Sequence, residues 1–109
     1  MKEEFYRAIN NKLKVRVTFN AKEEGKGQVT RTCIPFDFGA SQRVNVKDKT
    51  EKYHVLDLDT PDPKGPHPIA LRPEQITRLE VLNENFDPGD YIKGWTLNWI
   101  YKRDWGIYS

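Results

Sequence analysis

Arginine and aromatic side chains in this sequence could together bind a phosphate-bearing ligand. An arginine guanidinium forms paired hydrogen bonds with phosphate oxygens, and a flat ring can stack on a nucleobase. The candidates are Arg31, Arg43, Tyr53, His54 and Arg72. These residue types support the hypothesis of a site for nucleic acid or a nucleotide-like ligand.

Each of these residues also has a structural interpretation. Tyr53 can be a core ring or a cross-strand ring, because tyrosine is often largely buried. His54 can be a hydrogen-bonded histidine at a strand edge, and Arg72 can simply bond to the turn at Glu74. Both interpretations stay open at the level of the sequence.

The sequence lacks the motifs of common catalytic and cofactor sites. It contains no phosphate-binding loop, no G-x-G-x-x-G and no G-x-S-x-G. Cys33 lies in a strand pattern with no base in local reach, so we interpret it as a buried structural thiol. We expect a protein that is not an enzyme and that needs no cofactor.

Metal ligands are also sparse. His54 and His67 are the only histidines, and a single cysteine cannot complete a zinc site of ordinary spacing. Asp57, Asp59 and Asp62 resemble the start of a calcium loop, but Asp62 stands where the sharp turn needs glycine. No glutamate follows at the right distance, so we interpret the segment as a solvated turn without metal.

Charge and apolar patterning indicate the class of protein. Residues 1–52 hold 12 Lys/Arg and 7 Asp/Glu, a net of +5, whereas residues 53–109 hold 6 and 9, a net of −3. A basic first half is compatible with a nucleic-acid partner, and equally with an unevenly charged soluble surface. The start MKEEFYRAIN is not a signal peptide, and no apolar run approaches membrane length. With a single cysteine, we expect a cytoplasmic protein without membrane contact.

Periodicity predicts one helix followed by short strands. Residues 2–11 place Phe5, Ala8 and Ile9 at helical spacing. Residues 13–19 and 76–82 alternate apolar and polar side chains, as half-buried strands do. We further predict strands at 28–38, 53–58 (a central strand) and 67–71, a brief strand at 44–46, loops at 20–27 and 60–68, and one helical turn at 73–75. Pro35 should mark a strand end, an edge or a bulge.

The segment after residue 88 is rich in large rings. Trp95, Leu97, Trp99 and Tyr101 alternate with other residues, which predicts a strand at 95–101 with one heavy apolar face. We expect this face to pack mainly on the domain's own core, with Trp105 nearer solvent. The alternative is a contact surface for a protein partner or a homodimer through Trp95, Trp99 and Tyr101.

The order of segments resembles the WYL domain family over about residues 5–87. Residues 71–86, LRPEQITRLEVLNENF, are similar to its C-terminal signature, with Gln75 in place of the second arginine. Residues 53–55 stand where the Trp-Tyr-Leu strand would lie, although the tripeptide itself is absent. Arg31 with the Ile-Pro pair at 34–35 matches a further family strand, and Ala8-Ile9 with Val15-Val17-Phe19 matches the opening helix and first strand.

This resemblance implies a fold and a function. The implied fold is mostly β (α+β), a small Sm/SH3-like antiparallel β-barrel with a short N-terminal helix. It would span residues 1–87, with an aromatic extension at 88–109 packed on the same domain. WYL domains are often ligand-sensing modules of bacterial regulators that bind nucleic acid or nucleotide-like ligands. Arg72 matches the first signature arginine and Tyr53 the aromatic position. The resemblance implies a non-catalytic, regulatory binding module.

Overall fold

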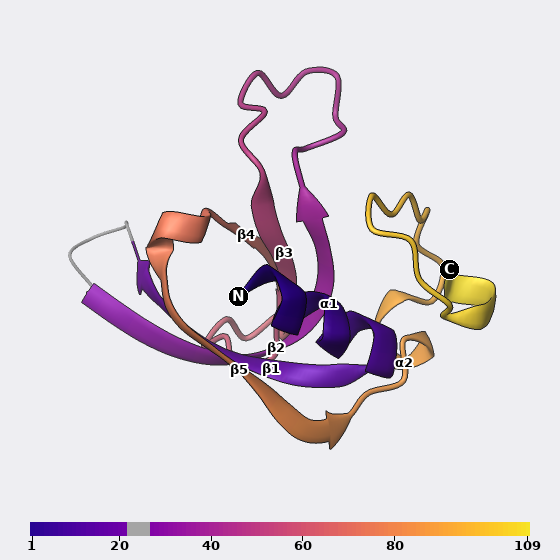
Figure 1. Ribbon diagram of the computed structural model, residues 1–109, viewed down its shortest axis with the longest axis horizontal. Coiled ribbons are helices and arrows are strands. Elements are labelled where there is room, and N and C mark those ends of the chain that lie inside the picture. Colours follow the sequence, from indigo (N-terminus) through magenta and orange to yellow (C-terminus); the bar gives the residue numbers. More distant parts are fainter. Residues whose placement is uncertain (22–26) are drawn as a thin grey trace.

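The computed structural model describes residues 1–21 and 27–109, which fold mostly as β-structure behind a short helix (Figure 1). The predicted helix at 2–11 is confirmed, as are the strand regions at 13–19, 28–38, 53–58, 67–71 and 76–82 and the helical turn at 73–75. The elements are α1 (Lys2–Asn11), β1 (Leu13–Ala21), β2 (Gly27–Gly39), β3 (Lys52–Asp57), β4 (His67–Leu71), η1 (Pro73–Gln75), β5 (Ile76–Asn85), α2 (Gly89–Ile92) and η2 (Gly106–Tyr108). Of the loop predicted at 20–27, residues 22–26 lie outside the described residues.

The five strands form one antiparallel sheet in the order β4-β3-β2-β1-β5. The sheet curves around α1, which lies against its concave side (Figure 1). β4 and β5 are its two edges, so the hydrogen-bonded ladder of the described residues is open between them. β3 is an interior strand, as expected, but β2 occupies the middle of the sheet.

The concave side carries the core because apolar residues alternate along the strands. Val15, Val17 and Phe19 of β1 point to this side and are buried with α1. α1 contributes Phe5 and Ile9, both fully buried. The helix ends where the next residue, Lys12, adopts a left-handed conformation (φ 54°) and its N–H bonds to the Ile9 carbonyl.

A bulge in β2 gives the sheet a second packed side, opposite the concave side that holds α1. The pairing of β2 with β3 shifts register between Pro35 and Asp37. Proline has no N–H to give to the ladder, which explains why the irregularity falls here. Phe36 and Asp37 are buried although the concave face is already occupied, because the segment after β5 covers the other side of the sheet.

Two predictions for irregular segments are wrong. Residues 44–46 form a turn rather than a strand, closed by the Val46 N–H on the Arg43 carbonyl. Residues 95–101 also form no strand. The backbone N–H groups of Ile100 and Tyr101 bond to the Asp37 carboxylate instead of to a neighbouring strand.

The predicted order of exposure in the aromatic segment is reversed. Trp105 is only 3% exposed, whereas Trp95 is 43% exposed. Trp105 is buried because its indole N–H donates to the Ile9 carbonyl at 2.9 Å and its ring contacts Phe86. Leu97, Trp99 and Tyr101 are half-buried against the core, as the alternation of the sequence suggested.

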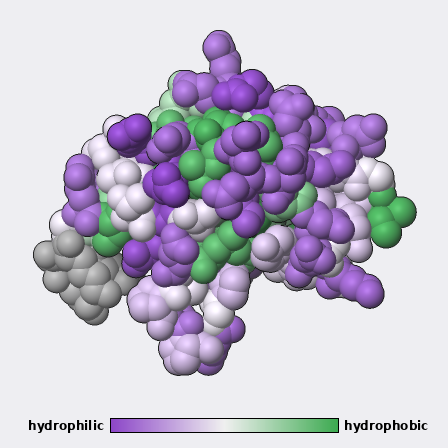
Figure 2. All heavy atoms as spheres, turned by 90° about the horizontal axis from the view of Figure 1, so that it is seen from below, coloured by the Kyte–Doolittle hydropathy of each residue, from purple (hydrophilic) through white to green (hydrophobic). Residues whose placement is uncertain are grey.

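One face of the molecule is mostly polar. Seen from below, hydrophilic side chains dominate this face and separate smaller hydrophobic patches (Figure 2). None of the helices in residues 1–21 and 27–109 is long and apolar enough to cross a membrane.

Candidate functional site

A buried carboxylate of β2 holds the irregular segment from Trp95 to Trp105 through hydrogen bonds. Oδ2 of Asp37 accepts the Ile100 N–H at 2.7 Å, and its Oδ1 accepts the Tyr101 N–H at 2.9 Å. Asp37 therefore replaces the strand partner that these backbone groups would otherwise need. This attachment holds the segment 95–100 over the outer side of β2 and β3.

Arg103 completes the attachment from the same segment. Its side chain is fully buried, lies 3.5 Å from Asp37, and donates to the Phe36 and Tyr101 carbonyls. The guanidinium lies 4.0 Å from the ring centroid of Trp99 and 4.6 Å from that of Trp105. Burial lowers the pKa of Arg103 to about 10, and the Asp37 carboxylate opposes that shift.

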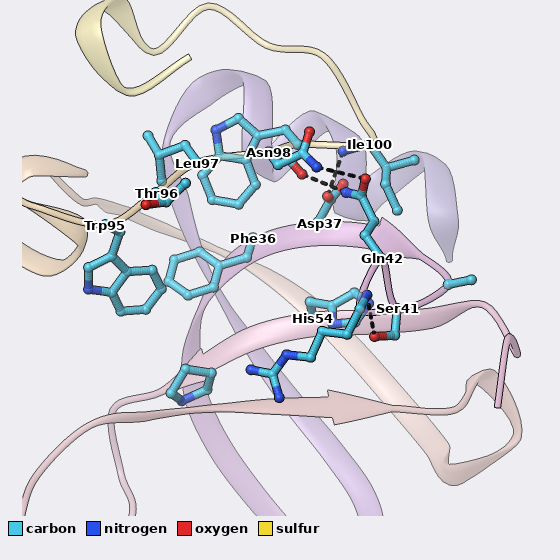
Figure 3. A pocket seen from close by; sticks show the side chains of 14 residues that line it. Phe36, Asp37, Ser41, Gln42, His54, Trp95, Thr96, Leu97, Asn98 and Ile100 are labelled. Atoms are coloured by element: carbon cyan, nitrogen blue, oxygen red, sulfur yellow. Dashed lines mark hydrogen bonds between the residues drawn. The ribbon is translucent and has the colours of Figure 1, made fainter. Parts of the chain in front are cut away.

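The attached segment forms one wall of a surface hollow of about 460 Å³ (Figure 3). Trp95 stands at one end, edge-on to Phe36 with the ring centroids 5.6 Å apart. At the other end Gln42 and Asn98 bridge the two walls: the Gln42 side chain donates to the Asn98 carbonyl, and the Asn98 side chain donates to Gln42. The opposite wall includes Arg43, His54 and Pro68.

A second hollow of about 330 Å³ continues from the first. The two share Ser41, Arg43, His54 and Pro68, so we treat them together as the outer groove. Together they run along the outer side of β3 and β4, from Trp95 to the loop before β3.

Arg43 and His54 offer polar groups to the outer groove. Nε2 of His54 donates to the Gly39 carbonyl at 2.8 Å, which fixes the ring and leaves Nδ1 as its second polar atom. Arg43 is exposed, and its guanidinium has no hydrogen-bond or ion-pair partner in the described part of the chain. A free guanidinium is suited to bind an anionic ligand.

Arg72 lies near the second hollow and is already paired. Its guanidinium is 3.0 Å from Asp48, which also pairs with Lys52 at 3.4 Å. Hydrogen bonds from Thr50 and the Lys52 ammonium hold the pKa of Asp48 well below its usual range. The Arg72 side chain therefore pairs with Asp48, whereas the Arg72 backbone bonds to the turn at 73–75: its N–H donates to the Gln75 side chain and its carbonyl accepts the Gln75 N–H.

The structure separates the five residues singled out in the sequence. Arg43 and His54 meet in the outer groove, and Arg72 lies beside it. The ring of Tyr53 lies in the core, 4.9 Å from Phe5 and 4.6 Å from Phe38, and is not brought to the groove. Arg31 lies on the concave side of the sheet, paired with Asp57.

Sequence reasoning did not connect Trp95 with Arg43. Trp95 stood out only as the first ring of an aromatic strand, and that strand does not form. The neighbourhood depends on Asp37, because this carboxylate brings residues 95–100 across to the loop that carries Arg43. No local sequence signal marks such a contact.

Ser41, His54 and Asp37 all line the groove but do not form a catalytic triad. In the described residues, Ser41 Oγ accepts the Arg43 N–H, and His54 bonds to the Gly39 carbonyl. The Asp37 oxygens are used by backbone N–H groups and Arg103. A triad would need direct Ser–His and His–Asp hydrogen bonds.

Comparison with known proteins gives no match: no protein-family model, curated protein or solved structure is similar to this chain. Within residues 1–21 and 27–109, no group of three or more His, Cys, Asp or Glu side chains is arranged to hold a metal ion.

Proposed function

We propose that this protein is a non-catalytic binding module that takes single-stranded nucleic acid or a nucleotide-like ligand in the outer groove. The observation that carries the proposal is the position of Trp95, a large ring left 43% exposed beside a groove that also holds Arg43. An exposed ring can stack on any base, and an unpaired guanidinium can bind the backbone phosphate next to that base.

The charges around the groove support this ligand class. The connection from Gly39 to Lys52 carries Arg43, Lys47, Lys49 and Lys52 against Asp48 and Glu51. Its net charge is +2, and Asp48 already pairs with Lys52 and Arg72. The segment therefore presents uncompensated positive charge next to the groove, which favours a polyanion.

The order of the elements is compatible with the Sm/SH3-like fold that the WYL resemblance implies. The first four strands are consecutive neighbours, and β5 returns to pair with β1 after the single turn η1. We propose that this is a partly open barrel of that type and that the protein acts as a regulatory module. Arg43 and His54 would then contact the ligand, whereas Tyr53 supports the core.

The test is binding of labelled single-stranded DNA and RNA, measured by fluorescence anisotropy at low salt. We expect the wild type to bind and Trp95→Ala to bind about 5- to 150-fold more weakly, which corresponds to about 1–3 kcal/mol for one stacked base. Ile107→Ala is the matched control, because Ile107 is another exposed apolar residue of the C-terminal segment outside the groove. Absence of binding by the folded wild type, or unchanged binding by Trp95→Ala, would refute the proposal.

A protein partner is the second candidate, and it rests on the same exposed ring. Trp95 and Ile100 are 43% and 44% exposed on one segment. Trp99 and Tyr101 are less available, because Trp99 donates to the Tyr108 carbonyl and Tyr101 stacks on Tyr6. Sedimentation of the wild type and Trp95→Ala over a range of concentrations tests self-association; a monomer at all concentrations would exclude the homodimer.

A further inference from the structure

The concave side of the sheet holds another hollow, of about 460 Å³, which is not part of the outer groove and which we call the inner cavity. Ile69 lines both this cavity and the outer groove, but their polar groups differ because β3 alternates: His54 points to the outer groove, whereas Asp57 lines the inner cavity. Phe19, Val29, Ile69 and Leu71 supply apolar walls. A hollow of this size and lining is typical of small-molecule sites.

One cation faces the inner cavity with part of its binding capacity unused. Arg31 Nε lies 3.3 Å from Asp57 Oδ2, which holds the guanidinium in place. In the described residues, its terminal nitrogens make only one long hydrogen bond, 3.5 Å to the Thr30 carbonyl. The outer edge of the guanidinium is therefore free to bind two oxygens of one ligand group side by side.

A histidine on the neighbouring strand has an unused polar atom at the same cavity. His67 of β4 pairs in register with Asp57 of β3, and both line the cavity. Nδ1 of His67 is shielded from solvent and has no hydrogen-bond partner among the described residues. Buried polar atoms are normally satisfied, but in the described part of the chain the packing around His67 leaves a polar group without a partner beside the cavity.

We propose that the inner cavity binds a small carboxylate with an apolar body. The carboxylate lies on the terminal nitrogens of Arg31, beside the His67 ring, and the body rests on the apolar walls. Asp57 does not touch the ligand; it is a positioning residue that holds Arg31.

The charge balance favours a carboxylate over a phosphate. Asp57 is almost completely buried, so it already offsets the charge of Arg31 at short range. A carboxylate adds one negative charge beside Asp57, whereas a phosphate dianion would add two, and the described residues of the cavity lining include no further Lys or Arg. A flat, two-oxygen anion also matches the geometry of the guanidinium.

The experiment uses amide NMR spectra of the whole chain titrated with phenylacetate, indole-3-acetate and hexanoate, and with phenylacetamide as a neutral analogue. We expect at least one carboxylate to shift the signals of Arg31, His67 and Leu71, which line the inner cavity alone, and not the Trp95 indole signal. Phenylacetamide should bind at least tenfold more weakly than phenylacetate if phenylacetate is the ligand that binds. No shift with any of the three carboxylates at about 10 mM, a very weak affinity, would overturn the proposal.

Two variants test the location without leaving a lone buried charge. Val29→Trp fills the cavity from a half-buried position, and the double variant Arg31→Gln with Asp57→Asn removes both charges together. Each should weaken carboxylate binding at least tenfold, and unchanged binding in Val29→Trp would overturn the proposal. Trp95→Ala should bind the carboxylate as the wild type does, so a failure here is distinguishable from a failure at the outer groove.

Discussion

Nη2 of Arg103 lies 3.5 Å from Oδ1 of Asp37, and both side chains are almost completely buried between the sheet and the aromatic segment. The pair joins positions 66 residues apart. Both charged groups are shielded from water. The stabilisation of each charge therefore depends on the opposite charge and on the surrounding hydrogen bonds. The attachment of residues 95–105, and with it one wall of the outer groove, rests on this pair.

The first prediction concerns removal of the buried carboxylate. Asp37→Ala leaves Arg103 buried without its partner and frees the N–H groups of Ile100 and Tyr101. We expect the free energy of unfolding to fall by about 3–5 kcal/mol, the usual cost of breaking a buried pair from one side. Urea denaturation followed by tryptophan fluorescence measures this loss.

The control for this substitution is Glu51→Ala, which removes an exposed acid next to β3. A surface change of this kind should alter stability by less than about 0.5 kcal/mol. Equal losses in the two variants would show that the buried pair does not hold the aromatic segment.

The second prediction compares two tryptophans of the same segment. Trp105→Ala removes a buried ring and its hydrogen bond to the Ile9 carbonyl, so it should cost about 3–5 kcal/mol. Trp95→Ala should cost much less, because 43% of Trp95 is already exposed. Thermal unfolding of both variants measures the two losses of stability. A larger loss in Trp95→Ala than in Trp105→Ala would contradict the burial of Trp105 and the exposure of Trp95.

The third prediction concerns the salt dependence of nucleic-acid binding. Arg43→Gln should weaken binding and reduce the slope of log K against log salt by about 0.7, the value for one phosphate contact on a single strand, because fewer counterions are released. Arg78→Gln is the control, since Arg78 is 73% exposed on the edge strand β5 and lies outside the groove. Identical slopes for Arg43→Gln and the wild type would remove Arg43 from the proposed site.

The fourth prediction follows from the buried thiol. Burial raises the pKa of Cys33 well above its ordinary value of 9.0, and the carboxylates of Asp57 and Asp59 add to the effect. Between pH 9 and 10 the unfolded chain loses the thiol proton while the native chain keeps it, so the native state binds more protons. The free energy of unfolding must then fall as pH rises, by about 1.4 kcal/mol at pH 10 from this group.

Urea denaturation at pH 7, 9 and 10 checks this fall, with Cys33→Ala as the comparison. Burial also raises the pKa of Tyr6 and Tyr53, but their ordinary value is 10.0, so they contribute mainly at higher pH. Cys33→Ala should therefore lose less stability than the wild type between pH 9 and 10. Parallel losses in the two proteins would contradict the prediction.

Much of the sheet could be predicted from local pattern. Leu13 to Phe19 alternate because one side of β1 packs on the concave core, and this alternation is readable in the sequence. In β5, Leu79 and Val81 pair with β1 on the same side, and a register shift near the start of the strand interrupts the alternation of burial. Pro35 predicted an irregularity because it lacks an N–H, and the bulge lies there. Cys33 is fully buried in a strand, as its neighbours suggested.

The aromatic segment and the outer groove depend on contacts between distant residues. The alternation from Trp95 to Tyr101 imitates a strand, but the Asp37 carboxylate satisfies the backbone there and no strand forms. Trp105 is buried because the Ile9 carbonyl at the end of α1 accepts its indole N–H. Neither contact has a local signature, so periodicity alone could place neither Trp105 nor the groove wall.

The hydrogen bond between Trp105 and Ile9 spans 96 positions and so has a consequence for synthesis on the ribosome. At ordinary elongation rates, residue 105 is added roughly 5–20 s after residue 9. In that interval the sheet up to β5 can form, while Phe36 and Phe86 still lack the rings that cover them in the finished protein. The nascent chain is therefore open to aggregation or chaperone capture at Phe36 and Phe86 until Trp99 and Trp105 are translated.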